Sequence, residues 1–342
     1  MLRIGIIGSG FGVIGLLPAF DSILGCKVVA ICAKKSEPLT RYSARTGMTR
    51  VYTDWKLLLE SEDLDAIALA VVPNAQYEIA KVAISKGLHV FAEKPLAANI
   101  TEARELLALA KKKKITHAID FLFPEIPEWK KVKTLLDDET YGKLTHVAVN
   151  WDWLSGNIKH HQANWKTSRK EGGGALSFYF SHGLYYLEHF AGKIKEHKSV
   201  MTYTPLSRDG EAGVDMVLRF ATGVVGNVHV SSHSPGLTRH QLKFQCERGV
   251  IVLENTNAIV DNFVIKIYSQ SGIKQLSVKK GKGIKGDDER VRIIRVVAKR
   301  FVEACRKGTQ MSPSFVDAVR VHELIEKIHA EAHLTKKSKK NK

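Results

Sequence analysis

Short apolar segments alternate with helical patterns over the first part of the chain. The apolar runs predict strands at Leu2–Ile7, Lys27–Cys32, Ala66–Val72, Leu88–Ala92 and Thr116–Phe121. Several of these runs contain almost no polar residue, as expected for strands that are buried on both faces of a sheet. Helices are predicted between them, to Phe20, from Pro73 to Ile84 and from Thr101 to Lys112. Strands that alternate with helices in this way predict βαβ units and a parallel sheet.

The pattern changes after Pro124 and Pro127. Apolar and polar residues then alternate, which indicates strands with one buried and one solvated face. Such strands are predicted at Leu144–Trp153, Asp215–Phe220, Gly226–Ser231, Gln241–Cys246 and Val264–Tyr268, with helices near 175–191, near 288–306 and at Phe315–Ala332. We therefore expect a second, α+β domain with an open, mostly antiparallel sheet.

Length and composition fit two domains. The chain has 342 residues, of which 44% are hydrophobic and 25% charged, so it can fill two cores and still present a solvated surface. We expect domains at residues 1–121 and 122–334, followed by a basic, disordered tail at residues 335–342. No signal peptide or membrane span is recognisable, and no cysteine pair has the spacing of a metal site, so a cytoplasmic protein without a metal is expected.

The formal charge of +17 is the unusual bulk property of this chain. It is consistent with general solubility, or with a basic field that attracts anionic substrates or cofactors. Because no helix-turn-helix, zinc-finger or aromatic RNA-binding pattern accompanies the charge, we expect no nucleic-acid partner.

A glycine-rich turn follows the first predicted strand directly. It consists of Gly8, Ser9, Gly10, Phe11 and Gly12, and a helix comes next. In this spacing the first glycine allows a tight turn and the second lets the backbone approach a diphosphate, which binds at the helix N-terminus. Val13 occupies the place of the third glycine in the usual fingerprint. The turn predicts a dinucleotide-binding site of the Rossmann type.

The second strand ends without the acidic residue that binds the ribose hydroxyls of NAD. In its place stand Ala33, Lys34, Lys35 and Ser36. Two cations and a hydroxyl at this point favour a 2′-phosphate, and therefore NADP. Two alternatives remain open: the lysines are ordinary exposed charges, or Glu37 supports NAD binding from an offset position.

Three motifs together resemble the glucose-fructose oxidoreductase / inositol dehydrogenase / MocA family. They are the N-terminal turn, the segment from Pro73-Asn74 to Glu93-Lys94-Pro95, and Gly172-Gly173-Gly174 followed by His182. Their order and spacing cover nearly the whole chain. The resemblance implies an α/β Rossmann domain followed by the open-sheet domain, with an active site in the cleft between them.

The resemblance also implies roles for individual residues. Lys94 would point at the reacting hydroxyl and the nicotinamide, the bond before Pro95 would be cis, and His182 would act as general base. The cofactor would be lined by Val72, Pro73, Asn74, Tyr77, Glu93 and Lys94. This agrees with the chemistry of alcohol oxidation, in which a histidine can accept the hydroxyl proton near neutral pH and a lysine can stabilise the developing alkoxide.

The chain departs from the family pattern beside His182. Phe178 stands where many members have an aspartate, Phe180 replaces a glycine, and Tyr185 stands at a later aspartate position. Either Lys94 and His182 suffice, helped by the candidate substrate contacts Tyr179, Tyr185 and Lys166, or the chain has lost catalysis and binds a dinucleotide for sensing or regulation. Lys166 is equally consistent with an ordinary loop lysine.

We expect an NAD(P)-dependent dehydrogenase or reductase acting on CH–OH groups. Its substrate would be a secondary alcohol or ketone of a sugar, polyol or nucleotide-linked sugar, and NADP is favoured over NAD. The basic balance favours an anionic substrate. The resemblance further implies a homodimer or homotetramer formed through the open face of the second sheet.

Overall fold

The computed structural model describes residues 1–257, 259–281 and 283–340. The chain forms two compact units. The first contains Met1–Leu122 and Gly281–Arg320, and the second contains Phe123–Lys280 and Val321–Lys342. This division differs from the expected one, because residues 281–320 return to the first unit instead of belonging to the second.

The first unit is built on a parallel sheet of six strands in the order β3-β2-β1-β4-β5-β6. The strands are β1 (Leu2–Ile7), β2 (Cys26–Cys32), β3 (Val51–Tyr52), β4 (Ala66–Leu69), β5 (His89–Ala92) and β6 (His117–Ile119). This is the strand order of a Rossmann fold. The predicted fold of the N-terminal region is confirmed, although β4 ends at Leu69, three residues before its expected end.

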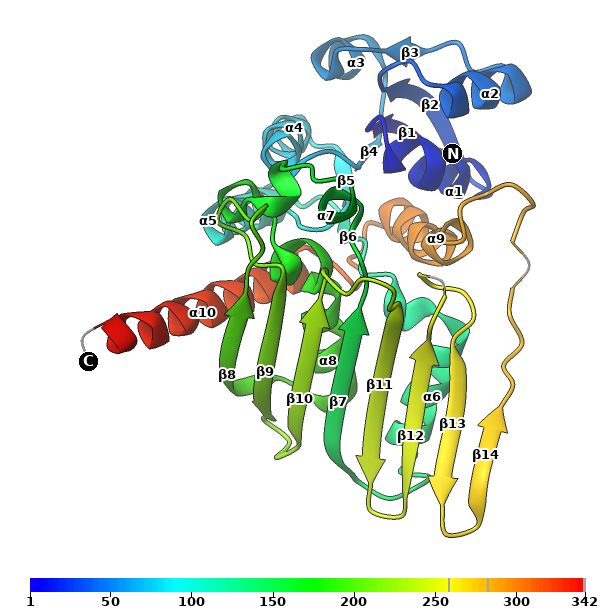
Figure 1. Cartoon of the computed structure of the whole chain (residues 1–342). Helices are drawn as coiled ribbons and strands as arrows, with labels where there is room; N and C mark the ends of the chain where they lie inside the picture. The colour runs from blue at the N-terminus through cyan, green and yellow to red at the C-terminus, as the bar shows by residue number, and fades with distance from the viewer. Residues whose placement is uncertain (258, 282, 341–342) are drawn as a thin grey trace. The chain divides into compact units, whose positions relative to one another are not determined.

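Helices follow most of these strands along the chain, and one further helix returns to the sheet from residues 291–307. They are α1 (Leu17–Asp21), α2 (Glu37–Thr46), α3 (Trp55–Ser61), α4 (Pro73–Ser85), α5 (Ile100–Lys113) and the returning helix α9 (Val291–Lys307). Helix α9 packs beside α1 and against β1 and β5 (Figure 1). Three buried rings join these elements, since the centroid of Phe91 lies 5.2 Å from that of Phe20 and 5.7 Å from that of Phe301. Segment 281–320 therefore completes the core of the first unit.

The second unit is built on an eight-stranded sheet in the order β14-β13-β12-β11-β7-β10-β9-β8. The strands are β7 (Leu144–Asp152), β8 (Ile194–Thr202), β9 (Gly213–Phe220), β10 (Val225–Ser231), β11 (Arg239–Cys246), β12 (Gly249–Asn255), β13 (Val264–Ser269) and β14 (Gly272–Leu276). Only β7 and β10 pair in parallel, and every other neighbouring pair is antiparallel. The expected open, mostly antiparallel sheet is confirmed.

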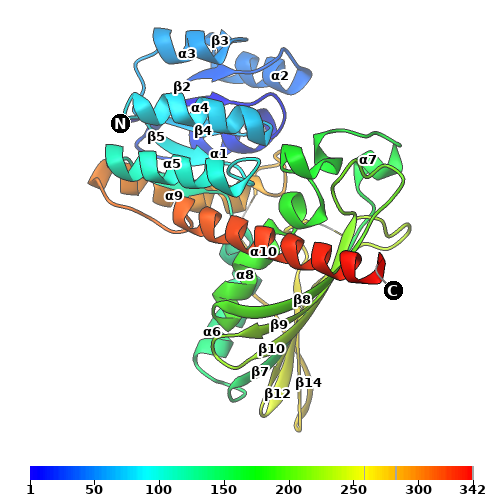
Figure 2. The ribbon, with the colours of Figure 1, turned by 90° about the vertical axis from the view of Figure 1, so that its left-hand side faces the viewer.

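Helices α6 (Pro127–Asp137) and α8 (Ser181–Ala191) lie on one face of this sheet (Figure 2). Short helical segments complete the unit: Phe123–Glu125, α7 (Gly156–Lys159), Trp165–Thr167, Arg169–Glu171 and Ala175–Tyr179. The last helix, α10 (Phe315–Lys340), begins in the first unit and continues in the second. The sequence predicted a disordered tail at residues 335–342. Helix α10 extends over its first six residues, and residues 341 and 342 lie outside the described residues.

Candidate functional site

The predicted cofactor residues of the first unit lie along one edge of the parallel sheet. Gly8 follows β1, Ala33 follows β2 and Glu93 follows β5; Asp120, which the sequence analysis did not predict, follows β6 at the same edge. Because neighbouring parallel strands end at the same edge, these residues come together although they are spread over more than a hundred positions. In open α/β sheets ligands bind at this carboxyl edge.

Gly8 is required by the path of the backbone. Its φ is +151°, and a Cβ atom at this position would lie 2.3 Å from the carbonyl oxygen of Ala70. Its N–H donates to the carbonyl of Cys32 at 3.0 Å, and the N–H of Ala70 donates to Ile7 at 2.9 Å. The first glycine thus lets β1 turn sharply between β2 and β4, as the fingerprint predicts.

The turn presents backbone donors that the protein itself does not use. Within the described residues, no hydrogen bond engages the N–H groups of Ser9, Gly10 or Phe11. The Ser9 hydroxyl accepts a hydrogen bond from the N–H of Lys34 at 2.8 Å, which ties the turn to the end of β2. A Cβ atom at Gly10 would meet nothing within 4 Å. Helical residues continue from Gly12 to Asp21, starting with a π-helical turn to Leu16. Free donors at the start of a helix and open space at Gly10 suit a diphosphate.

The end of β2 carries the residues expected to select the nucleotide. Ala33 is buried, while the side chains of Lys34 and Lys35 are exposed. Among the described carboxylates, none lies within ion-pair distance of either lysine. The buried Ser36 hydroxyl has no hydrogen-bond partner in this part of the chain. Glu37 lies 3.7 Å from Arg41 in the first turn of α2. Two unpaired cations and a hydroxyl therefore flank this end of the site.

The residues after β4 divide into two groups. Val72 and Pro73 begin α4 at the carboxyl edge, and Asn74 is exposed in its first turn. The hydroxyl of Tyr77, one turn further, instead donates to Glu105 on α5 at 2.5 Å and accepts from Lys81 at 3.0 Å. The structure therefore groups Val72, Pro73 and Asn74 with the glycine turn, and directs the polar end of Tyr77 to α5.

The loop that carries Lys94 is held by a glutamine that the sequence analysis did not single out. Gln76 is buried on α4, and its Nε2 donates to the carbonyls of Glu93 at 2.6 Å, Pro95 at 2.9 Å and Leu96 at 3.2 Å. The Lys94–Pro95 bond is cis, as expected from the resemblance. The side-chain amide of Gln76 thus fixes the backbone on both sides of Lys94.

Four charged groups gather at the same loop. Burial raises the pKa of the Glu93 carboxyl, and it raises that of Asp120 well above its usual range, where the charge of Glu93 adds to the effect. The positive charges of Lys94 and Arg290 act on both carboxyls in the opposite direction. Two adjacent buried carboxyls repel each other when both are ionised, which favours the protonated form of one of them. Lys94 therefore lies beside a buried acid pair.

The glycine triplet of the second unit has strict steric requirements. A Cβ atom at Gly173 would lie 2.2 Å from the carbonyl oxygen of Trp165, and Gly174 has φ +96°. The carboxylate of Glu211 accepts a hydrogen bond from the N–H of Leu176 at 2.7 Å and contacts Nε2 of His329 at 3.1 Å. Both Glu211 and His329 are buried. The triplet thus rests on a segment that contains Lys166 and on the buried contact between Glu211 and His329 of α10.

A π-helical turn, Ala175–Tyr179, leads from the triplet into α8. Such turns occur frequently at functional sites. His182 is buried in the first turn of α8, with its ring centroid 5.0 Å from that of Phe123. Phe180, which replaces a family glycine, is fully buried, and its ring occupies the space that a side chain at position 183 would need. Gly183 therefore leaves the space that the Phe180 ring occupies.

The three candidate substrate residues lie near this turn. The ammonium group of Lys166 is half-buried 4.9 Å from the ring centroid of Phe178, and burial lowers its pKa. None of the described carboxylates forms an ion pair with it. The ring of Tyr179 packs between Trp153 and Phe178, and burial raises the pKa of its hydroxyl. Tyr185 is half-buried on α8. The position at which many family members have an aspartate is thus occupied by Phe178, beside other aromatic rings and the ammonium group of Lys166.

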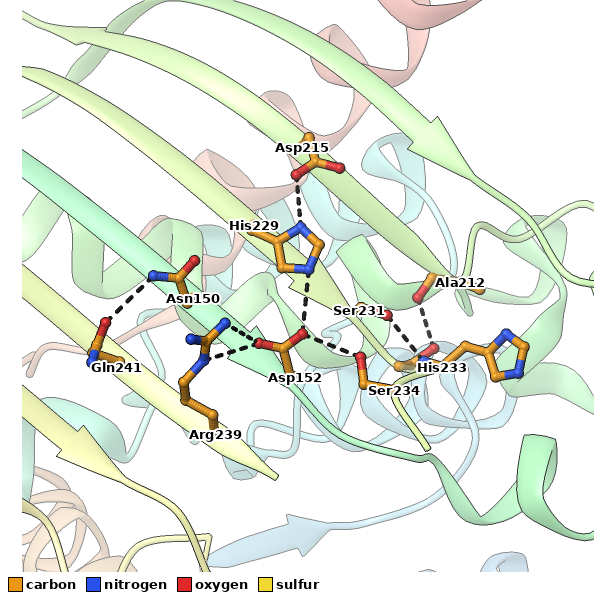
Figure 3. Close-up of polar contacts among 11 residues, drawn as sticks. Asn150, Asp152, Ala212, Asp215, His229, Ser231, His233, Ser234, Arg239 and Gln241 are labelled. Carbon is orange, nitrogen blue, oxygen red and sulfur yellow. Dashed lines mark hydrogen bonds and ion pairs between the residues drawn. The ribbon is translucent and has the colours of Figure 1, made fainter. Parts of the chain in front are cut away.

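A second polar network lies on the sheet of the second unit, away from the predicted motifs (Figure 3). The buried carboxylate of Asp152 accepts hydrogen bonds from Arg239 at 2.8 Å and Ser234 at 3.1 Å, and lies 3.3 Å from Nε2 of His229. Nδ1 of the same histidine lies 2.7 Å from Asp215. Among the described residues, no group of three or more His, Cys, Asp or Glu side chains is arranged to hold a metal. The network therefore satisfies a buried charge and joins β7, β9, β10 and β11.

Comparison with known proteins identifies relatives of both parts of the chain. Residues 2–121 match the model of an oxidoreductase family with an NAD-binding Rossmann fold, and residues 129–252 match the C-terminal domain of the same GFO/IDH/MocA family. An uncharacterised oxidoreductase of Synechocystis sp. is 28% identical over 272 residues, which cover 75% of this chain and 72% of that protein.

Solved structures show the same fold. Levoglucosan dehydrogenase in complex with NADH and levoglucosan superposes with a TM-score of 0.84, at 20% identity and with 97% of each chain covered. A 3-ketoreductase from Actinomadura kijaniata, in complex with NADP and TDP-benzene, gives a TM-score of 0.79 at 21% identity, with 96% of this chain and 97% of that chain covered. Among the described residues, no helix combines the length and the apolar character needed to cross a membrane. The two family models together match most of the chain, and the chain belongs to the GFO/IDH/MocA oxidoreductase family.

Proposed function

We propose that this oxidoreductase transfers a hydride between NADP and a secondary alcohol or ketone of a sugar, polyol or nucleotide-linked sugar. The main support for this proposal is the carboxyl edge of the parallel sheet in the first unit. The glycine turn, with its unused backbone N–H groups, and the Glu93-Lys94-Pro95 loop both follow strands of this sheet at that edge. Levoglucosan dehydrogenase and the Actinomadura 3-ketoreductase, which share the fold, were solved with a sugar and a nucleotide-linked ligand respectively.

Lys94 and His182 are the proposed catalytic residues. The ammonium group of Lys94 would donate a hydrogen bond to the reacting oxygen and stabilise the charge that develops there. The imidazole of His182 would accept the hydroxyl proton in the oxidative direction and return it in the reductive one. The nicotinamide, when bound, supplies the hydride acceptor. Glu93 and Asp120 interact electrostatically with Lys94, and negative charge on this acid pair would favour the ammonium form of the lysine.

The test begins with binding and then turns to turnover. NADPH and NADH are titrated into the wild-type protein, and a panel of sugars, polyols and nucleotide-linked sugars is then screened by the absorbance change of the nicotinamide. Lys94→Met and His182→Asn are expected to bind NADPH within about threefold of the wild type and to lose at least about 100-fold in kcat. Binding without turnover of any compound would favour the regulatory alternative, whereas absence of binding at millimolar concentration would refute the dinucleotide site itself.

The preference for NADP rests on the unpaired lysines after β2. Replacing both Lys34 and Lys35 by alanine should weaken NADPH binding by about tenfold or more and leave NADH binding nearly unchanged, because only NADPH carries the 2′-phosphate. Lys27→Ala is the matched control, since Lys27 is exposed at the opposite end of the same strand. Equal losses for both nucleotides, or no loss, would contradict the assignment to NADP.

Lys166, Tyr179 and Tyr185 are proposed substrate contacts. The half-buried ammonium of Lys166 beside Phe178 suits an anionic group next to a flat or apolar surface of the substrate. Lys166→Met should raise KM for anionic substrates of the panel more than for neutral ones. Equal KM changes for both classes would reject this contact.

A homodimer or homotetramer is proposed through the sheet face opposite α6 and α8. No helix of the described residues covers that face, which carries the network of Asp152 and His229 (Figures 2 and 3). Light scattering after size exclusion should give a multiple of the 38.1 kDa chain mass. A monomer at micromolar concentration would contradict the proposal.

A further inference from the structure

Arg290 reaches the glycine turn from the far end of the chain. It lies directly before α9, in the segment that returns to the first unit. Its guanidinium carbon lies 4.1 Å from the centroid of the Phe11 ring, and Phe11 belongs to the turn whose N–H groups are unused. An arginine is thus placed beside the proposed diphosphate site by a segment that has no recognisable binding motif.

The Phe11 ring packs against Gly15, where the absence of a side chain leaves room for it. A Cβ atom at Gly15 would lie 2.5 Å from the ring, so only a glycine leaves room for it there. The ring therefore packs onto its own helix at Gly15 and offers a surface to Arg290. Stacking of a guanidinium on an aromatic ring within about 6 Å is favourable and restricts its orientation.

Asp288 fixes the orientation of the Arg290 guanidinium group within its plane. Nε and Nη2 of Arg290 donate to the two carboxylate oxygens of Asp288, each at 2.8 Å. This side-on pairing leaves the Nη1 edge, which has no hydrogen bond within the described residues. Arginine stays charged at all relevant pH values, so this edge always presents donors.

The charges around Arg290 indicate which part of the cofactor it faces. Arg290 acts electrostatically on Glu93 and Asp120, the acid pair beside Lys94. It also contacts Phe11 in the turn. It therefore lies between the diphosphate end and the nicotinamide end of the proposed site. A planar guanidinium edge is well suited to phosphate oxygens.

We propose that Arg290 binds the diphosphate of the dinucleotide through its Nη1 edge, with Phe11 and Asp288 as the residues that orient it. This inference rests on the proposed dinucleotide site. It assigns a second source of donors to the diphosphate, in addition to the backbone N–H groups of the glycine turn.

The test measures the affinity of NADPH and of ADP-ribose, which contains the diphosphate but no nicotinamide. Arg290→Met should weaken both ligands by a similar factor of about 10 to 100, the usual effect of losing a hydrogen bond to a charged group. The affinities of Arg290→Lys should lie between those of the wild type and those of Arg290→Met, because lysine keeps the positive charge but lacks the planar pair of donors. Asp288→Asn should weaken both ligands less than Arg290→Met, since it loosens the arginine without removing it.

Lys299→Met is the matched control. Lys299 is exposed on the same helix α9, and its removal changes the net charge equally. Wild-type affinity in this control, with the expected losses in Arg290→Met, supports the proposal. If Arg290→Met binds both ligands like the wild type, or if it changes only the KM for the substrate, the inference is overturned while the dinucleotide site stands. If the wild type binds neither ligand, the proposed function fails first. Melting temperatures of all variants identify any loss that is due to unfolding.

Discussion

Replacing Gln76 by methionine should separate the positioning of Lys94 from cofactor binding. Methionine has nearly the same volume, so the packing of α4 is largely kept. The substitution removes the amide that donates to the carbonyls of Glu93, Pro95 and Leu96. Two N–H groups make these contacts, and each buried hydrogen bond contributes about 1 kcal/mol. The Oε1 atom of Gln76 has no partner among the described residues, so its removal costs nothing in hydrogen bonds. The expected loss is about 2 kcal/mol of unfolding free energy.

Urea unfolding and steady-state kinetics measure the two consequences. The unfolding midpoint should fall, and kcat should drop by about tenfold or more because the loop around Lys94 is less well fixed. The affinity for NADPH should change little, since Gln76 does not touch the glycine turn. Gln162→Met is the control, because Gln162 is exposed in the second unit. If Gln76→Met retained both the stability and the kcat of the wild type, the three hydrogen bonds would not support Lys94 as we argue.

Three further predictions follow from other residues. Gly8→Ala should lose roughly 3 kcal/mol of stability because its Cβ would lie 2.3 Å from a carbonyl oxygen, whereas Gly10→Ala should keep its stability in urea and lose NADPH affinity in titration. Burial lowers the pKa of His117 from 6.5 to about 4. The unfolded chain therefore binds a proton that the folded one does not, and stability should be constant above about pH 6.5 and fall towards pH 4 by up to roughly 1.4 kcal/mol per pH unit. His117→Gln should show a smaller difference between urea midpoints at pH 7 and pH 4.5, and an equal difference would contradict the assignment. Glu211→Ala should cost about 3 kcal/mol, because it leaves the Leu176 N–H and His329 without their buried acceptor, and an unchanged unfolding midpoint would exclude that role.

Elements of the fold could be predicted where the local sequence has a clear hydrophobic pattern. The buried strands of the first sheet contain little besides apolar residues, and β1 was predicted with its observed ends. Strand β8 was not predicted, because it is an edge strand whose sequence, IKEHKSVMT, is largely polar and mostly exposed or half-buried. The assignment of α9 to the second unit also failed. Its amphipathic pattern shows that one face is buried, but it carries no information about which core buries it.

Residues of the candidate site could be proposed from the sequence only where they belong to a motif that is continuous in sequence. The glycine turn and the Lys94 loop are such motifs. Asp120 follows a buried strand just as Glu93 does, and its position at a strand end was a signal that sequence analysis could have used. Gln76 and Arg290 gave no such signal, because each acts on a loop distant in sequence through a side chain whose direction is set by packing.

The return of α9 to the first sheet has a consequence for how the protein is made. During synthesis the six parallel strands emerge long before the helix that covers Phe20 and Phe91. Until residue 320 has left the ribosome, that patch of aromatic surface has no native cover, and a fragment that ends near residue 122 would keep it uncovered permanently. Nascent chains of this protein are thus expected to depend on chaperones during the interval in which the whole second unit is translated.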